Sequence, residues 1–480
     1  MRHAVWGDGV VVKRLASKAV RVVFVRSPTL PRTFRLSDRK LRSLMPAAAG
    51  AGPASGSSSA SFVEENAPAP KIVAPTPADF VPPTQPIAFA EPSFASDLDH
   101  ADAWQTLEAL RLGVVPARGV QEYTVAREAE LASIGEMYDD NAGCRVLWGD
   151  YGTGKTHLLE TAEQLALERG FATARVTLDP KENALHHPLR LYQRIANSMR
   201  TSDQVGMGLD WLFEQLCESD DHFDPGGKRA SRFFSPYLHV LRKGTTARVG
   251  WMREYVFGED VPSQEVNSNA YHHGWRGGRL LRMSDYRTFG RMYMHLLGTL
   301  SCWYADAGKR GLVLLFDEVE RVEALNHADR GHALEVLQHY AAVTMQPDDL
   351  AFEPDSLYKG GREVHRELPL RFRDQQPLST IFALTPLEEI RAQFLEITQS
   401  ETYDVHLGPL HADLLKPLVA RIAGIYERAY VGHTVSEGAR GYAHEQLRDS
   451  FNSGHTSFRD AVRAAVFLFD ANRLADNSTS

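Results

Sequence analysis

The stretch CRVLWGDYGTGKT, residues 144–156, decides the fold of this 480-residue chain. Its first five residues are mostly apolar, as in a buried strand, and its second part is rich in glycine and ends in Gly-Lys-Thr. A helical pattern begins at Leu158, and Gly170 provides a stop signal. The stretch therefore predicts a strand, a tight loop and a helix, in this order.

A loop of this composition is suited to holding phosphate groups. Glycines let backbone N–H groups close around a phosphate at a helix N-terminus, where the helix dipole favours negative charge. Lys155 is expected to reach the β- and γ-phosphates of ATP, and the Thr156 hydroxyl to bind Mg²⁺. ATP and Mg²⁺ are therefore the expected cofactors. The expected nucleotide-binding residues of the loop are Gly149, Asp150, Tyr151, Gly152, Thr153, Gly154, Lys155, Thr156 and His157.

A second apolar run, Leu312–Phe316, ends in two carboxylates. A carboxylate at the end of a strand beside the phosphate loop can hold Mg²⁺, and the next one can polarise the attacking water. We assign Asp317 to the metal and Glu318 to catalysis on the water. The pair predicts an ATPase that converts ATP and water into ADP and phosphate.

A third strand-like run, residues 379–384, is followed by Thr385. A polar residue in this place can contact the γ-phosphate or its water, which is the sensor role in AAA+ ATPases. The alternative is that Thr385 caps the helix that follows, because Pro386 and Glu388 come next in the manner of a capping box.

A family resemblance appears upstream of the loop. Residues 124–131, TVAREAEL, resemble the GRExEL box of Orc/Cdc6-like and STAND-like AAA+ ATPases, with Ala126 in place of the customary glycine and Arg127 near the nucleotide. Further phrases are EALRLGVVP (108–116), GDYGTGKTHLLE, TLDP (177–180), GLVLLFDEVE and SFRDAVRAAV (457–466). Together, over residues 101–475, they resemble the ATP-binding proteins of BREX systems, of the BrxD-like branch.

The resemblance implies a role in bacterial anti-phage defence, with DNA and other defence proteins such as a helicase as partners. It also implies that Arg459, in the C-terminal helical part, acts as a second sensor. In a homo-oligomer, a neighbouring subunit would supply an arginine finger, which is worth about 10³- to 10⁵-fold in rate. Arg330 and Arg321 are the candidates for this finger.

The predicted fold is α/β: an AAA+ parallel sheet flanked by helices, a C-terminal all-helical lid, and a small N-terminal β-barrel on a disordered linker. Residues 1–45 alternate like short strands and resemble SH3/Tudor-like modules, while residues 46–100 are rich in Ala, Pro and Ser. Residues 101–405 form the expected ATPase domain with insertions, and residues 406–480 the expected helical lid.

Charge separates the N-terminal module from the rest of the chain. The net charge of −8 combines +9 over residues 1–45 with −17 over the remainder. The basic segment is expected to bind DNA phosphates. Because the apolar runs are too short to cross a bilayer, we expect a cytoplasmic protein that does not contact a membrane.

Two long intervals indicate insertions. Lys155 and Asp317 are separated by 162 positions, and Asp317 and Thr385 by 68. The first interval holds basic residues interleaved with aromatic ones at 226–260, which fits either DNA binding or amphipathic helices with a core stripe; we favour the core stripe. The second interval includes an expected exposed loop at residues 358–362, able to touch DNA or a partner.

Three functions fit these patterns. The leading one is a DNA-associated AAA+ ATPase that loads or regulates a helicase or effector complex in anti-phage defence. The second is a STAND-like scaffold or switch that holds nucleotide and turns it over very slowly. The third is a helicase loader or replication-initiator-like ATPase without an immune role.

Overall fold

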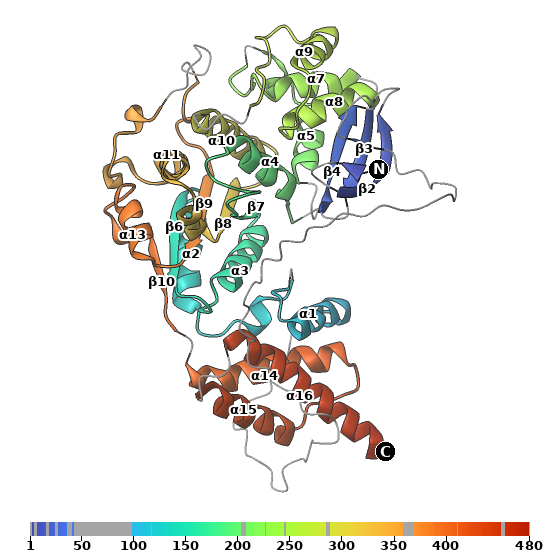
Figure 1. Cartoon of the computed structure of the whole chain (residues 1–480), viewed down its shortest axis with the longest axis vertical. Helices are drawn as coiled ribbons and strands as arrows, with labels where there is room; N and C mark the ends of the chain where they lie inside the picture. The colour runs from blue at the N-terminus through green and yellow to red at the C-terminus, as the bar shows by residue number, and fades with distance from the viewer. Residues whose placement is uncertain are drawn as a thin grey trace, which may run out of the picture. The chain divides into compact units, whose positions relative to one another are not determined.

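The computed structural model (Figure 1) divides the chain into two units, Met1–Ala69 and Pro70–Ser480. In the first unit it describes the backbone of five short strands. In the second it describes residues 98–479 except 117, 203–207, 226, 244–245, 285–288, 359–367, 410 and 453–456. The predicted linker and the predicted loop at 358–362 therefore lie largely outside the described residues. Within the described part, no helix has the length and apolar character needed to span a membrane.

The strands of the first unit form one antiparallel sheet in the order β4-β3-β2-β1-β5. Among the strand residues described, the outer strands β4 and β5 each pair with a single neighbour and do not pair with each other. The β-rich character expected for residues 1–45 is present, but a closed barrel and an SH3/Tudor-like module are not supported. The strands are β1 (Arg2–His3), β2 (Gly7–Leu15), β3 (Ala19–Phe24), β4 (Ser27–Arg35) and β5 (Leu41–Arg42).

The second unit is built around a five-stranded parallel sheet in the order β10-β6-β9-β8-β7. Its strands are β6 (Gly143–Gly149), β7 (Ala172–Thr177), β8 (Leu312–Asp317), β9 (Leu378–Leu384) and β10 (Asp404–Leu407). The three central strands β6, β9 and β8 are almost wholly buried, as near-continuous apolar strands of a covered parallel sheet must be. Their carboxyl ends bring the three predicted polar motifs to one edge.

Helices cover both faces of this sheet, so the predicted α/β class is confirmed (Figure 1). On one face, α2 (Glu128–Asp139) and α3 (Lys155–Glu168) bury side chains such as Ile134 and Leu158. On the other, α4 (Pro188–Ser198), α10 (Gly290–Asp306) and α11 (His327–Thr344) enclose a larger core. The shorter elements after the central strands are η3 (Val319–Ala324), η4 (Pro347–Asp349), η5 (Pro354–Ser356), α13 (Glu388–Leu395) and η6 (Glu401–Tyr403).

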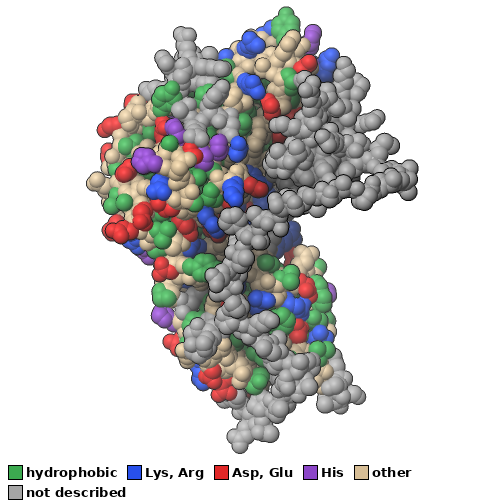
Figure 2. All heavy atoms as spheres, in the orientation of Figure 1, with side chains coloured by type: hydrophobic (Ala, Val, Ile, Leu, Met, Phe, Trp, Pro, Cys, Tyr) green, Lys and Arg blue, Asp and Glu red, His purple; other side chains and the backbone are tan. Residues whose placement is uncertain are grey.

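The long interval between β7 and β8 folds into helices. These are α5 (Gly208–Leu216), α6 (Asp220–Phe223), α7 (Ser235–Lys243), α8 (Thr246–Val256) and α9 (Ser263–His272). Phe233, Phe234 and Tyr237 are buried, so the aromatic residues expected at 226–260 form a core and are not available to stack on bases. On the face shown in Figure 2, Lys and Arg side chains are interspersed with Asp and Glu.

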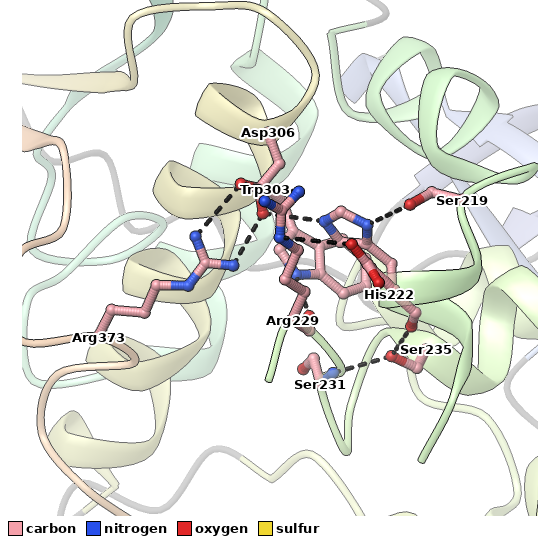
Figure 3. A network of polar contacts seen from close by, with 9 residues as sticks. Ser219, His222, Arg229, Ser231, Ser235, Trp303, Asp306 and Arg373 are labelled. Atoms are coloured by element: carbon pink, nitrogen blue, oxygen red, sulfur yellow. Dashed lines mark hydrogen bonds and ion pairs between the residues drawn. The ribbon is translucent and has the colours of Figure 1, made fainter. Parts of the chain in front are cut away.

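A partly buried carboxylate links these helices to the ATPase core (Figure 3). Asp306, at the end of α10, accepts a hydrogen bond from His222 Nε2 at 3.0 Å and from Arg373 Nη2 at 2.8 Å. Arg229 lies at 3.6 Å. Burial opposes the charge, but the hydrogen bonds from His222 and Arg373 lower the pKa of Asp306 to about 2. The ionised carboxylate thus joins the helical insertion to the segment before β9.

The C-terminal residues form a helical region, as predicted, and they share a hydrophobic core with the helix that precedes the sheet. Leu107 and Leu110 of α1 (His100–Leu112) pack with Leu418 and Ile422 in this core. Residues 101–405 were expected to form the ATPase domain, but α1, at the start of this range, packs against the C-terminal helices. We call this group of helices the helical bundle; its other members are η2 (Gln121–Tyr123), η7 (Ala412–Leu414), α14 (Leu415–Ala429), α15 (Glu437–Asn452) and α16 (Phe458–Thr479).

Candidate active site

The glycine-rich loop connects β6 to α3 through backbone conformations that require glycine. Gly152 and Gly154 have φ angles of 85° and 94°, in the left-handed region. At Gly149 a Cβ atom would lie 2.5 Å from the Thr153 hydroxyl oxygen, so a side chain would collide with the loop itself. Thr153 closes the turn by donating to the carbonyl of Asp150 at 2.9 Å. The loop therefore has the curvature that phosphate binding needs.

Lys155 lies where the loop meets the end of β9. Its Nζ donates to the carbonyl of Gly149 at 2.7 Å and to Thr385 Oγ1 at 3.0 Å. Thr385 is not the capping residue of α13: Leu387 occupies that position, and no side chain caps the helix. The structure therefore brings Thr385 to the lysine, where the sensor interpretation would have it.

The two residues expected to bind Mg²⁺ are in direct contact. Thr156 Oγ1 donates to Asp317 Oδ2 at 2.8 Å, and Asp317 is 4% exposed. Burial raises the pKa of Asp317, and the hydrogen bond from Thr156 opposes this shift. A hydroxyl and a carboxylate side by side are the hard oxygen ligands that Mg²⁺ prefers, usually with substrate phosphates and water completing the shell. In the described part of the chain no group of three His, Cys, Asp or Glu forms a self-sufficient metal cage.

Glu318 follows on a strained backbone, with φ 58°. Its side chain is 39% exposed and accepts a hydrogen bond from Arg321 Nε at 2.6 Å. Arg330, the other finger candidate, pairs with Glu323 at 2.9 Å and donates to the Glu323 carbonyl at 2.8 Å. Both arginines therefore form ion pairs with glutamates of their own chain that follow β8.

Residues upstream of the loop brace it. Arg127 is 6% exposed; it donates to the Thr153 carbonyl at 2.8 Å and pairs with Glu130 at 2.9 Å. Ala126 adopts a φ of 51°, so the tight turn of the box is kept even though an alanine stands in the glycine position. Arg127 therefore fixes the position of the loop by binding the carbonyl of Thr153.

His157 lies at the start of α3 and is a neutral side chain. Its Nε2 lies 2.7 Å from the Thr124 hydroxyl, and its ring packs edge-on against Tyr123 with 4.8 Å between centroids. Burial, and then the charge of Arg127, lower the pKa of His157 to about 4. The imidazole therefore adds no positive charge to the phosphate site at neutral pH.

Many of these residues line one cavity of about 330 Å³, the size of a small-molecule site. One wall, which we call the phosphate wall, holds the loop together with Asp317, Glu318 and Glu320. A second set of lining residues, which we call the base wall, comes mainly from the helical bundle and from the segments that directly follow α1 and η2. Its apolar members are Leu110, Val114, Val115, Tyr123, Val125, Phe458 and Val462, and Arg459 lies beside them.

The predicted site residues fall into two groups. The loop residues 151–157, Asp317, Glu318, Arg127 and Arg459 all line the cavity, whereas Gly149, Asp150, Thr385 and Arg330 are not among its lining residues. Tyr151 is 93% exposed, so most of its ring faces solvent. Sequence reasoning missed Glu320 and the apolar base wall. The phrase GLVLLFDEVE contained Glu320, but no spacing rule assigned it a role.

A comparison with known protein families finds a match over the part of the chain that contains the phosphate loop. Residues 99–218 match the family described as BREX system ATP-binding protein BrxC/D. The matched region includes Arg127, the phosphate loop and α3, and it ends before Asp317. No curated protein matches the chain. Over the residues that hold the phosphate loop, the chain is therefore similar to the ATP-binding proteins of BREX systems.

Proposed function

We propose that this protein binds Mg²⁺-ATP and hydrolyses it as part of a BREX-like anti-phage defence system in the cytoplasm. The observation that carries the proposal is that polar residues at the ends of β6, β8 and β9 contact one another beside one cavity. Lys155 contacts Thr385, and Thr156 contacts Asp317, although the partners are far apart in sequence. These are the residue types that Mg²⁺-dependent phosphoryl transfer uses.

Binding would begin with Lys155, whose ammonium exchanges its contacts with loop carbonyls for oxygens of the β- and γ-phosphates. Thr156 and Asp317 would hold Mg²⁺, which when bound neutralises charge on the phosphates. Glu318 would orient the water and accept its proton. The water oxygen bonds to the γ-phosphorus while the bond from that atom to the β–γ bridging oxygen breaks, and the bridging electron pair leaves with ADP.

The base wall supports adenine binding and a link to the helical bundle. Phe458 and Val462 of α16 face the same cavity as Val115 and Tyr123. Apolar and aromatic side chains of this kind favour a planar base. Arg459 lines the same cavity, and we propose that it acts as a second sensor. Hydrolysis would then change what Arg459 holds and so alter the position of the helical bundle.

Association with DNA, with a helicase or other defence protein, and with further copies of the chain belongs to the same proposal. The +9 charge of residues 1–45 supports DNA binding through phosphates. If this segment neutralises about six phosphates, the logarithm of the binding constant falls with log[salt] at a slope of about −5. Equal DNA affinity after removal of residues 1–45 would contradict this part of the proposal.

A slow switch is the second candidate, and the Glu318–Arg321 ion pair favours it. A carboxylate that is occupied by an arginine of its own chain is less available to a water molecule. Such a protein would keep its nucleotide and change state without rapid turnover. Retention of ADP by the purified protein, with negligible phosphate release, would distinguish the switch from the ATPase.

The test is phosphate release by the full chain with Mg²⁺-ATP, with and without duplex DNA. Lys155→Ala is expected to reduce turnover by about 10²- to 10³-fold, because it removes the cation that faces the phosphates. Lys243→Ala is the matched control, since this exposed lysine at the end of α7 does not line the cavity. Unchanged turnover in Lys155→Ala would refute the enzymatic proposal. Stimulation by DNA would support the DNA-associated function.

A further inference from the structure

A hydrogen-bonded chain links the phosphate lysine to a carboxylate that the mechanism above does not use. Lys155 Nζ donates to Thr385 Oγ1 at 3.0 Å, and Thr385 Oγ1 donates to Glu320 Oε1 at 2.6 Å. Lys155 is the first residue of α3, Thr385 directly follows β9, and Glu320 lies in η3 after β8. Lys155 and Glu320 line the cavity; Thr385 is not among its lining residues but is hydrogen-bonded to both.

The chemistry of a hydroxyl group limits what Thr385 can do in this arrangement. A threonine hydroxyl has one hydrogen to donate and two lone pairs with which to accept. The hydrogen goes to the Glu320 carboxylate, and one lone pair accepts from Lys155. One lone pair remains. Thr385 held in this way can accept a hydrogen bond from a water molecule, but it has no hydrogen left for a γ-phosphate oxygen.

Glu320 differs from Glu318 in its surroundings. Glu318 is 39% exposed and bound by Arg321, whereas Oε2 of Glu320 is buried and has no hydrogen-bond partner among the described residues. A buried carboxylate oxygen without a partner is costly, and a bound water or a functional role can account for it. The contact of Glu320 with the site is made through its other oxygen, which accepts from Thr385.

We propose that Glu320 is a positioning residue for hydrolysis, and that it acts through Thr385. By taking the hydroxyl hydrogen, Glu320 turns Thr385 into an acceptor toward the attacking water. The water then donates one hydrogen to Thr385 and presents the other to Glu318. This inference rests on the proposed ATPase function. It makes Thr385 a hydrogen-bond acceptor toward the attacking water, and not a donor to the γ-phosphate.

The experiment measures kcat and KM for Mg²⁺-ATP, together with the affinities for fluorescent ATP and ADP, on the full chain. Glu320→Ala is expected to lower kcat by roughly 10- to 100-fold with KM nearly unchanged, because only the orientation of the water is lost. Glu320→Gln keeps an acceptor oxygen and is expected to recover most of the rate. Thr385→Val should lower kcat equally and leave the ratio of ATP to ADP affinity unchanged. In the double variant the two losses should not add.

Three results would overturn the proposal: wild-type turnover in Glu320→Ala, additive losses in the double variant, or a selective loss of ATP affinity in Thr385→Val. Should Glu320→Ala fail to fold, the results for Glu320→Gln and Thr385→Val decide between the same outcomes. Glu335→Ala, which alters a half-buried glutamate on α11 away from the cavity, controls for a general loss of stability. Absence of turnover in the wild-type chain would instead refute the ATPase function, and this inference with it.

Discussion

The two walls of the cavity differ in construction. The phosphate wall is polar and comes from the loop after β6 and from residues at the end of β8, two strands that both pair with β9, so a single sheet fixes the distances between its groups. The base wall is apolar and belongs largely to the helical bundle, which has a hydrophobic core of its own. Under the proposed function, the chemical step and the binding of the base would therefore depend on different parts of the second unit. Substitutions in the two walls should have separable kinetic effects.

The largest effect is expected from the phosphate wall. Asp317→Asn removes a charged Mg²⁺ ligand and should reduce turnover by about 10³-fold, since metal stabilisation of the transition state is worth several kcal/mol. Binding of fluorescent ATP should lose its dependence on Mg²⁺ in a titration with EDTA. Asp413→Asn, at an exposed position in η7, serves as the control. A variant with normal Mg²⁺ dependence would show that Asp317 is not the metal ligand.

A smaller effect is expected from the base wall. Phe458→Ala should raise KM for ATP roughly 10-fold with little change in kcat, because burial of an aromatic side chain contributes to binding but not to the chemical step. Phe467→Ala is a matched control on the same helix, since this phenylalanine is 40% exposed and does not line the cavity. Equal KM values for the two variants would show that Phe458 does not contact the base.

The smallest effect on turnover is expected from Arg321, which forms an ion pair with Glu318 of the phosphate wall. Arg321→Ala frees Glu318 from its ion pair and should raise basal turnover roughly 2- to 5-fold, as expected for loss of a partly exposed pair. Arg448→Ala removes another partly exposed arginine from the helical bundle and should leave turnover unchanged. Slower turnover in Arg321→Ala would instead indicate that this arginine assists the reaction, for example in a neighbouring subunit.

Much of the phosphate wall was predictable because its signals are local. The loop, β8 and β9 each combine an apolar strand with polar residues at its end, and parallel strands bring such ends together. The α/β sheet with flanking helices and the helical C-terminal region followed from the same patterns and are confirmed. The closed N-terminal barrel was not supported, because alternation over residues 1–45 predicts strands but not how the outer ones pair.

The base wall could not be predicted from spacing. Val115 and Phe458 are brought together only by packing of α1 against α14 and α16, and helix amphipathicity does not specify a partner so far along the chain. Glu320 was missed for a different reason. Its significance lies in one hydrogen bond to Thr385, a contact between residues 65 positions apart that no single motif contains.

The pairing of α1 with the C-terminal helices has a consequence for biosynthesis. A ribosome produces α1 before any strand of the parallel sheet, but its packing partners α14 and α16 follow β10 and are translated after all five of those strands. Domains fold as units as their segments leave the ribosome. The parallel sheet can therefore assemble before the helices that pack against α1 have been synthesised. A nascent chain arrested after β10 would carry a complete phosphate loop and expose Leu107 and Leu110 as a temporary target for chaperones.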